Sequence, residues 1–411
     1  MTGCLVLTVS AGHLGGGEDP GLRVAQALLA HGFPVASRQV VDEEEAAVEA
    51  ALRWGVEAHG LVVILSGAGG SSGEVVRRVL SRVTGSRLVL NDRLLAALKE
   101  FHAGRDRPMP RRADRLALLP QGAAVWTVQD GEPGWCLETP AGGIAVLPLG
   151  TPLLDVLIDK GLLPFARGRF GGKGVVRLKT LRCVGVEPAI VEERLGEWIG
   201  GSGEVTVSCL SLEGEVWVRL RARGTSLPMA ESAMGEVETA VVAALGDDCY
   251  GSDQEALESV VGRILADRRL TLSVAESCTG GLLGHRITNV PGSSVYFERG
   301  VVAYSNRAKE ALLSVPRQAL ATHGAVSRPV VEAMARGILR ASGSSFGLAI
   351  TGIAGPDGGT RAKPVGTVFI ALATPEGVEA HRFKFTGGRE SIKWQSAQMA
   401  LDLLRRHLLK T

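Results

Sequence analysis

Residues 274–284 read VAESCTGGLLG, and this stretch decides how the last third of the chain is interpreted. An apolar run ends at Glu276, the side chains of Ser277, Cys278 and Thr279 follow, and two glycines precede an amphipathic stretch. This order predicts a strand, a tight turn and a helix. Free N–H groups at a helix start can hold a phosphate or an oxyanion. The turn is therefore a candidate nucleophile site, with Ser277 as the nucleophile and Cys278 as the alternative. The same pattern is also typical of an ordinary helix cap, in which Ser277 or Thr279 only caps the helix.

The sequence around this turn predicts an α/β domain. A helix begins near Gln254, and strands are expected at 271–275, 300–304, 346–350 and 366–373, separated by helical stretches. Alternating strands and helices favour a parallel sheet with helices on its faces.

A lysine follows the second of these strands. The stretch RGVVAYSNRAKEALL (299–313) predicts a strand, a cap at Ser305 or Asn306, and Lys309 in the first helical turn. The positive end of a helix and burial both lower a lysine pKa, and a neutral amine can take a proton from a serine. A solvated surface lysine is the alternative. Tyr304 is expected either to orient the amine or to lie in the core.

Two further loops predict a ligand pocket. The loop AITGIAGPDGGTRAKPVGTV (349–368) follows an apolar strand and carries Thr351 and Asp357. In TGGRESIK (386–393), Arg389 near a helix start is a candidate phosphate clamp, with a solvated arginine as the alternative. Loops at the carboxyl ends of parallel strands bind ligands in α/β proteins, so we expect a small polar ligand here.

Composition limits the class of protein. The chain has 411 residues, 45% of them apolar and 21% charged, with a net charge of +2. These values indicate a globular protein without the basic footprint of a nucleic-acid binder. No apolar stretch approaches the roughly 20 residues that span a membrane. The start does not resemble a signal peptide, and six cysteines without paired spacing fit a reducing cytoplasm, where we expect the protein.

The length predicts more than one domain. Alternating strand and helix patterns extend over 1–165, and the Gly/Arg-rich stretch ARGRFGGKG (166–174) indicates a linker. A β-α-β-β-α pattern occupies 170–250, and the third domain covers 254–411. The predicted fold class is α/β with three domains, in which two α/β/α sandwiches flank a small α+β domain.

Six motifs in the third domain resemble the C-terminal domain of the CinA (competence/damage-inducible) family. They are AESCTGG, PGSSVYFERGVVAYSNRAK, HGAVS, TGIAGPDGG, KPVGTV and TGGRE. Domains of this family hydrolyse the carboxamide of nicotinamide mononucleotide (NMN) to nicotinate mononucleotide and ammonia. The resemblance implies Ser277 as nucleophile, Lys309 as base and Tyr304 as an assisting residue, without a metal or other cofactor.

The resemblance also implies a set of substrate-binding residues and an oligomer. The binding residues are Glu276, Thr279, Gly280, Gly281, Asn306, Thr351, Gly352, Gly355 and Arg389. One departure is Lys393, where relatives often carry a second arginine. Family members commonly form dimers, so we expect a homodimer. The middle domain resembles a KH domain without an evident GXXG clamp, and nucleic acid is not an expected partner.

The first domain is similar to the molybdopterin-binding fold, which in this family can hydrolyse ADP-ribose with a divalent metal. The family loop TGGLGPTxDD reads SGAGGSSGEVV (66–76), with Glu74 at the first aspartate and Val75 at the second. The motif LPGPPxE has become LPLGTPLLD (147–155). Hard cations need several oxygen ligands, so we predict a degenerate site with Glu74 as the candidate ligand of this loop. Glu18 and Asp19, in a separate glycine-rich loop, are the further carboxylates that could approach it. The alternatives are an active metal-dependent ADP-ribose pyrophosphatase, or a non-catalytic scaffold in competence or DNA-damage response.

Overall fold

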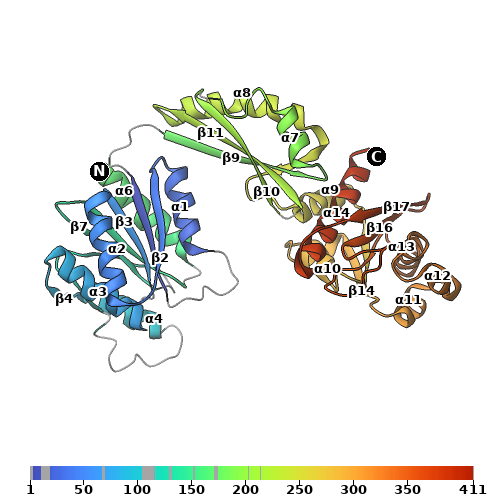
Figure 1. The fold of residues 1–411 in the computed structure, drawn as a ribbon, viewed down its shortest axis with the longest axis horizontal. Helices are drawn as coiled ribbons and strands as arrows, with labels where there is room; N and C mark the ends of the chain where they lie inside the picture. The colour runs from blue at the N-terminus through green and yellow to red at the C-terminus, as the bar shows by residue number, and fades with distance from the viewer. Residues whose placement is uncertain are drawn as a thin grey trace. The chain divides into compact units, whose positions relative to one another are not determined.

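The computed structural model describes residues 3–10, 19–66, 70–103, 115, 117–128, 132–150, 153–170, 175–201, 203–212 and 214–410. The chain divides into two compact units, Met1–Arg177 with Ala222–Ser232, and Leu178–Arg221 with Ala233–Thr411. The predicted α/β class is confirmed (Figure 1). Among the described helices, none is both long enough and apolar enough to cross a bilayer.

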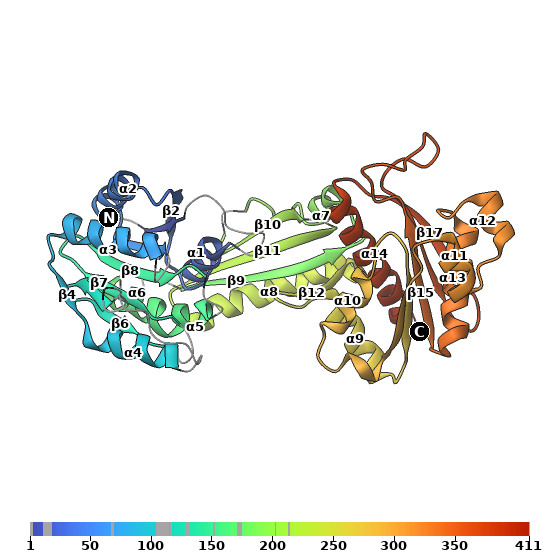
Figure 2. The ribbon, with the colours of Figure 1, turned by 90° about the horizontal axis from the view of Figure 1, so that it is seen from below.

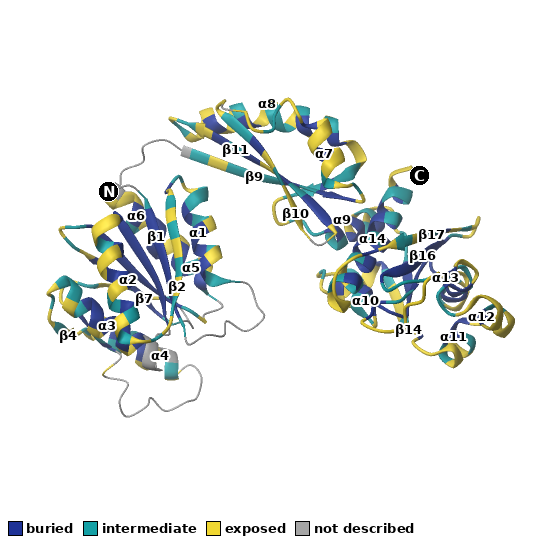
Figure 3. Cartoon of the chain, in the orientation of Figure 1, coloured by how far each residue is buried: buried dark blue, intermediate teal, exposed yellow. Residues whose placement is uncertain are grey.

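The N-terminal domain is a three-layer sandwich around one mixed sheet. In spatial order its strands are β2 (Val35–Val41), β1 (Cys4–Val9), β3 (Leu61–Ser66), β8 (Gly143–Pro148), β7 (Gly134–Glu138) and β6 (Ala124–Trp126). The first four are parallel, and β7 is antiparallel to both of its neighbours, β8 and β6. A separate two-stranded ribbon pairs β4 (Leu88–Leu90) with β5 (Leu118–Pro120). Strands β1, β3 and β8 are buried throughout because helices cover both faces (Figure 3).

The helices of this domain fall into two groups, one for each face of the sheet. One face carries α2 (Glu45–Ala58), α3 (Gly70–Thr84) and α4 (Asp92–Ala103). The other carries α1 (Pro20–Ala30), α5 (Leu154–Leu157), a π-helical turn (Ile158–Leu162) and α6 (Leu163–Phe170). The predicted linker at 166–174 is partly wrong, because α6 continues to Phe170. Leu163 and Ala166 are buried against the sheet and hold this helix in place. Residues 171–174 lie outside the described part of the chain.

The middle domain has the predicted β-α-β-β-α order with one additional strand. Its sheet runs β10 (Val205–Leu212), β11 (Glu215–Gly224), β9 (Val175–Val184) and β12 (Cys249–Ser252), with helices α7 (Pro188–Arg194) and α8 (Leu227–Leu245). Gly214 has a φ of +80°, as the hairpin between β10 and β11 requires. Strand β12 was not predicted, because GDDCYG is typical of a turn.

The C-terminal domain has a five-stranded mixed sheet. The strand order is β14 (Phe297–Val302), β13 (Leu272–Glu276), β15 (Phe346–Gly352), β16 (Thr367–Ala373) and β17 (Val378–Lys384). Strand β13 is parallel to both of its neighbours, and β16 is antiparallel to both of its own, β15 and β17. The four predicted strands are present, but β17 was missed because its sequence VEAHRFK carries too many charges for a buried strand.

Helices cover both faces of this sheet (Figure 2). One face packs against α9 (Leu257–Asp267), α10 (Leu282–Thr288) and α14 (Arg389–Lys410). The other packs against α11 (Asn306–Leu313), α12 (Arg317–His323) and α13 (Arg328–Ser342). Strands β14 and β15, the next two in the sequence, lie on opposite sides of β13. The carboxyl end of β13 is therefore a topological switch point, where α/β sheets bind ligands.

Candidate active site

Ser277 is the first residue beyond β13. Its backbone N–H donates to Ile350 O of β15 at 3.0 Å, which fixes the residue to the neighbouring strand. The side chain is 7% exposed. Gly280 and Gly281 follow with φ values of +64° and +98°, a region that a residue with a Cβ rarely adopts. The two glycines therefore allow the chain to turn from the strand into α10.

Glu276 has a structural role in this turn. It is 1% exposed, and its carboxylate accepts hydrogen bonds from the N–H groups of Gly281 (3.0 Å), Leu283 (3.1 Å) and Gly284 (2.8 Å). A carboxylate at a helix start satisfies free donors and complements the helix dipole. These amides are thus occupied by the protein itself, and Glu276 holds the turn that carries Ser277.

Lys309 lies in the first turn of α11, as predicted, and Ser305 caps that helix. The lysine is 1% exposed. Its Nζ lies 2.9 Å from Ser277 Oγ, 2.8 Å from Ala303 O and 3.3 Å from Tyr304 O. The predicted alternative of a solvated lysine is therefore wrong.

Burial lowers the pKa of Lys309 below its ordinary value of 10.5, and no carboxylate of the described residues counteracts this effect. A neutral amine has two N–H groups and one lone pair. The carbonyls of Ala303 and Tyr304 can take the two N–H groups, which leaves the lone pair for the Ser277 hydroxyl. The arrangement is suited to proton abstraction from that hydroxyl.

Cys278 was the alternative nucleophile. Burial raises the pKa of its thiol to about 12, so the thiol is protonated at neutral pH. Since the thiolate is the reactive form, this environment makes Cys278 a poor nucleophile.

A cavity of about 260 Å³ opens beside Ser277. Of the predicted site residues, those that line it are Ser277, Tyr304, Lys309, Thr351, Gly352, Gly355 and Arg389. Those that do not are Glu276, Thr279, Gly280, Gly281 and Asn306. Glu276 and Thr279 are buried in the turn, and Asn306 is an exposed residue at the start of α11.

Sequence reasoning missed a third wall of this cavity. Ala325 and Val326 line it, and Ala325 O accepts a hydrogen bond from Thr351 Oγ1 at 3.0 Å. They belong to the HGAVS motif, but their own side chains carry no reactive group and so gave no chemical signal.

Tyr304 and Arg389 meet at the mouth of the cavity. Arg389 Nη2 donates to the Tyr304 hydroxyl at 3.1 Å, and Nη1 donates to Gly355 O at 2.6 Å. The tyrosine side chain is 62% exposed, so the alternative of a core tyrosine is wrong. The contact between Tyr304 and the lysine amine is made by the backbone carbonyl and not by the phenol.

Two backbone amides of the turn are available as donors. Within residues 214–410, which are all described, no other residue provides an acceptor for the N–H groups of Cys278 and Thr279. The hydroxyl of Thr279 is also buried, with no hydrogen-bond partner among the residues that the structure describes. Lys393 Nζ lies 3.9 Å from the position that a Cβ on Gly280 would occupy, so this lysine reaches the same turn from α14.

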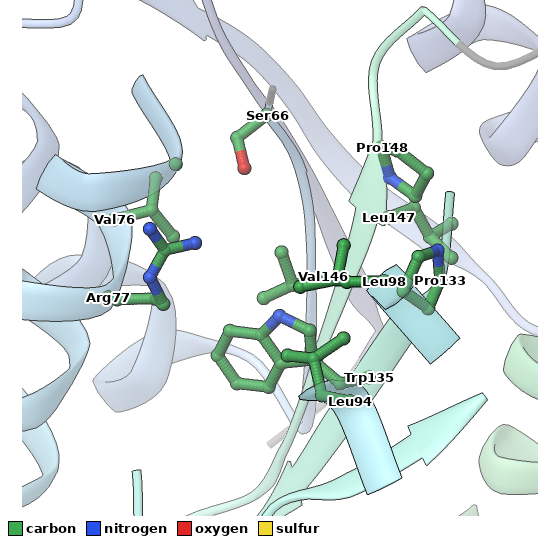
Figure 4. Close-up of a pocket in the computed structure, with 11 residues that line it drawn as sticks. Ser66, Val76, Arg77, Leu94, Leu98, Pro133, Trp135, Val146, Leu147 and Pro148 are labelled. Carbon is green, nitrogen blue, oxygen red and sulfur yellow. The ribbon is translucent and has the colours of Figure 1, made fainter. Parts of the chain in front are cut away.

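The pocket of the N-terminal domain has a different character (Figure 4). Its volume is about 20 Å³, and it is lined by apolar side chains such as Leu94, Trp135 and Val146. The buried guanidinium of Arg77 faces this space opposite Ser66, and burial lowers the arginine pKa. The lining contains no carboxylate among the described residues.

The predicted metal ligands of this domain do not converge in the described structure. Glu74 has a side chain that is 52% exposed and pairs with Arg78 at 3.9 Å, whereas Val75 is buried. Asp19 caps α1 and pairs with Arg38. Glu18 and the preceding glycine-rich loop lie outside the described residues. No group of three or more His, Cys, Asp or Glu side chains with metal-site geometry occurs in the described part of the chain.

Comparison with known proteins identifies the family. The chain is 37% identical over 390 residues to a putative competence-damage inducible protein of Symbiobacterium thermophilum, covering 92% of each chain. It matches the family described as "CinA C-terminal domain" over residues 254–408. The chain belongs to the CinA family. A second CinA relative, the putative competence-damage inducible protein of Moorella thermoacetica, is 41% identical over 349 residues and covers 85% of this chain and 84% of its own.

The other two domains of this CinA family member also match known families. Residues 178–251 match "Damage-inducible protein CinA KH domain", and residues 18–149 match "Probable molybdopterin binding domain". Among solved structures, a CinA superfamily protein of Klebsiella pneumoniae is 37% identical, covers 38% of this chain and 97% of its own, and has a TM-score of 0.37.

Proposed function

We propose that the C-terminal domain hydrolyses the carboxamide of NMN to nicotinate mononucleotide and ammonia by a serine–lysine mechanism. The observation that carries the proposal is the contact of 2.9 Å between Ser277 Oγ and the amine of Lys309, which is buried without a carboxylate partner among the described residues. A lysine in such surroundings is suited to act as a base at neutral pH. The choice of NMN as the amide rests on the family resemblance of the motifs.

The chemistry follows from this pair. Lys309 takes the hydroxyl proton as Ser277 attacks the carboxamide carbon. The amides of Cys278 and Thr279 are the donors that we assign to the oxyanion, each worth about 3 kcal/mol. The protonated amine then gives this proton to the carboxamide nitrogen, the C–N bond breaks, and ammonia leaves. Water hydrolyses the acyl-enzyme with the same lysine as base. None of these steps requires a metal.

Arg389 is the group that we assign to the phosphate of the substrate. A guanidinium has five N–H donors, and the hydrogen bonds to Gly355 O and Tyr304 Oη leave others for a ligand. The exposed Tyr304 ring borders the same cavity and offers a face for the pyridinium ring of NMN. Lys393, near Gly280, is a second positive charge for the same phosphate.

The test measures ammonia release from NMN by the full chain and by two variants of adjacent residues. Ser277→Ala should abolish turnover and leave the fold intact, whereas Cys278→Ala, the matched control, should retain most of the activity. Full activity in Ser277→Ala would exclude the serine as nucleophile. ADP-ribose turnover, measured on the same preparation with and without divalent metal, separates the deamidase from the pyrophosphatase alternative. If the unchanged chain turned over neither compound, a non-catalytic scaffold would be favoured.

A further inference from the structure

The fold of the middle domain brings two distant cysteines together. Cys183 is the penultimate residue of β9 and Cys249 is the first residue of β12, and the two are direct partners in the antiparallel register of these strands. Both are free thiols. Their separation along the sequence gave no indication of a pair, and the unpredicted strand β12 is the element that creates it.

The register places the two cysteines opposite each other, beside an irregularity of the ladder between Cys249 and Gly251. Directly opposed residues of antiparallel strands have Cα atoms about 4.5–5.5 Å apart. Disulfides span Cα distances of about 4.4–6.8 Å. A third cysteine of this domain, Cys209, lies on β10, which β11 separates from β9. Two strand spacings amount to about 9.5 Å, which is too far for a disulfide.

The two thiols differ in accessibility and in acidity. Cys249 is partly exposed, whereas Cys183 is fully buried. A hydrogen bond from the Cys183 thiol lowers the pKa of the Cys249 thiol below its ordinary value, and the nearby Arg405 acts in the same direction. The same contact, together with burial, raises the pKa of Cys183. Cys249 is therefore the thiol that a reagent can reach as a thiolate.

The pair also lies where α14 docks on the middle domain. The residues beside the two cysteines bind α14 directly: Arg406 donates to Val184 O at 2.9 Å and to Asp248 Oδ1 at 2.7 Å. Arg405 donates to Asp247 O at 2.6 Å. A covalent link between β9 and β12 would hold both strands of this joint together.

We propose that Cys249 and Cys183 form a reversible redox site, in which a low-molecular-weight disulfide oxidises the pair to a cross-strand disulfide. This role is independent of the proposed deamidase activity.

Each step of the oxidation balances. The Cys249 thiolate attacks one sulfur of the small disulfide, a mixed disulfide forms, and one small thiolate leaves. The Cys183 thiol then loses its proton and attacks Cys249 Sγ, which releases the second small thiol. Two protein thiols are oxidised to one disulfide, and one small disulfide is reduced to two thiols. An excess of dithiol reductant reverses the reaction.

The experiment treats the reduced full chain with oxidised glutathione under native conditions, alkylates the remaining thiols, and maps the peptides by mass spectrometry. We expect a Cys183–Cys249 cross-link, the loss of two hydrogen atoms from the intact mass, and full reversal by dithiothreitol. Cys183→Ser should stop at a glutathione adduct on Cys249, because the resolving thiol is missing. Cys249→Ser should show neither adduct nor cross-link, and the control Cys209→Ser should behave as the unchanged protein.

Mapping of the unchanged protein makes the test independent of how well the variants fold. A cross-link that forms only in denaturant would overturn the proposal. So would a cross-link that includes Cys209, or a stable glutathione adduct on Cys249 while Cys183 is still present.

Discussion

Replacement of Lys309 by methionine should separate activity from stability. Methionine keeps an unbranched side chain but has no amine to accept the proton of Ser277. General-base catalysis contributes about 10²–10⁴-fold, which corresponds to about 3–5 kcal/mol in the activation barrier. We therefore expect NMN turnover by Lys309→Met to fall by at least about two orders of magnitude.

The stability of the same variant should change little at neutral pH. The variant loses hydrogen bonds to Ala303 O and Tyr304 O, each worth about 1 kcal/mol. This loss is offset because burial of the amine costs free energy of desolvation, and the apolar methionine side chain does not have this cost. We expect a net change within about 2 kcal/mol of zero in the free energy of unfolding.

The lowered pKa of Lys309 predicts the direction in which stability and activity change with pH. Burial lowers the pKa of Lys309 in the folded protein, so between that value and 10.5 the unfolded chain binds more protons than the folded one. The lysine contribution to stability therefore rises with pH across this window, by at most about 1.4 kcal/mol per pH unit. Activity should rise with pH through the lowered pKa and be lost toward acid, as the amine becomes protonated. The methionine variant should lack this component of the stability profile.

The assay combines ammonia release with urea unfolding at a series of pH values. Lys309→Arg is the matched variant, because a guanidinium stays protonated at any working pH and cannot act as a base. It should be nearly as inactive as Lys309→Met. Near-normal turnover by Lys309→Arg would refute the reasoning and make the lysine an electrostatic clamp.

Three further changes test other parts of the structure. Glu276→Gln should lower the free energy of unfolding by about 2–4 kcal/mol, because it weakens charge-assisted hydrogen bonds to backbone amides. It should also lower kcat more than it raises KM. Unchanged urea unfolding would exclude the capping role. Gly337→Ala should destabilise the chain by about 3 kcal/mol, because the added Cβ would lie 2.0 Å from Leu313 O. The control is Gly235→Ala, which should be neutral or stabilising because no atom of the described residues outside the helix's own backbone lies within 4 Å of the added Cβ at this helical position. Equal melting temperatures of the two variants would contradict this prediction. The full chain should show little ADP-ribose hydrolysis with magnesium, manganese or cobalt, and robust turnover that disappears in Glu74→Ala would show that the N-terminal site is active.

The Ser277–Lys309 contact, on which the proposed function rests, was predictable because each residue follows a strand. Ser277 and Lys309 both stand where an apolar run gives way to a helix start, and parallel neighbouring strands end at the same edge of a sheet. The sequence therefore predicted their proximity. It did not predict that Glu276 binds three backbone amides, because backbone donors are the same in every residue and leave no mark in a sequence.

Contacts between distant segments were the least predictable. The Cys183–Cys249 pair depends on the register of two strands, one of them only four residues long. Edge strand β17 was missed for a similar reason: its charged residues face outward, and only pairing with β16 makes it a strand. In both cases the partner, and not the local pattern, determines the structure.

The hydrogen bonds of Glu276 affect what the motif AESCTGG can reveal about other chains. The glutamate and the two glycines of this motif serve the turn, and their contacts are made whether or not a substrate is turned over. Natural selection for a stable fold would therefore preserve them in a relative that had lost its chemistry. The motif alone diagnoses ancestry, whereas joint retention of Ser277 and Lys309 would diagnose an intact proton-transfer pair. A survey of relatives that separates these two sets of positions would distinguish working enzymes from descendants that keep only the architecture.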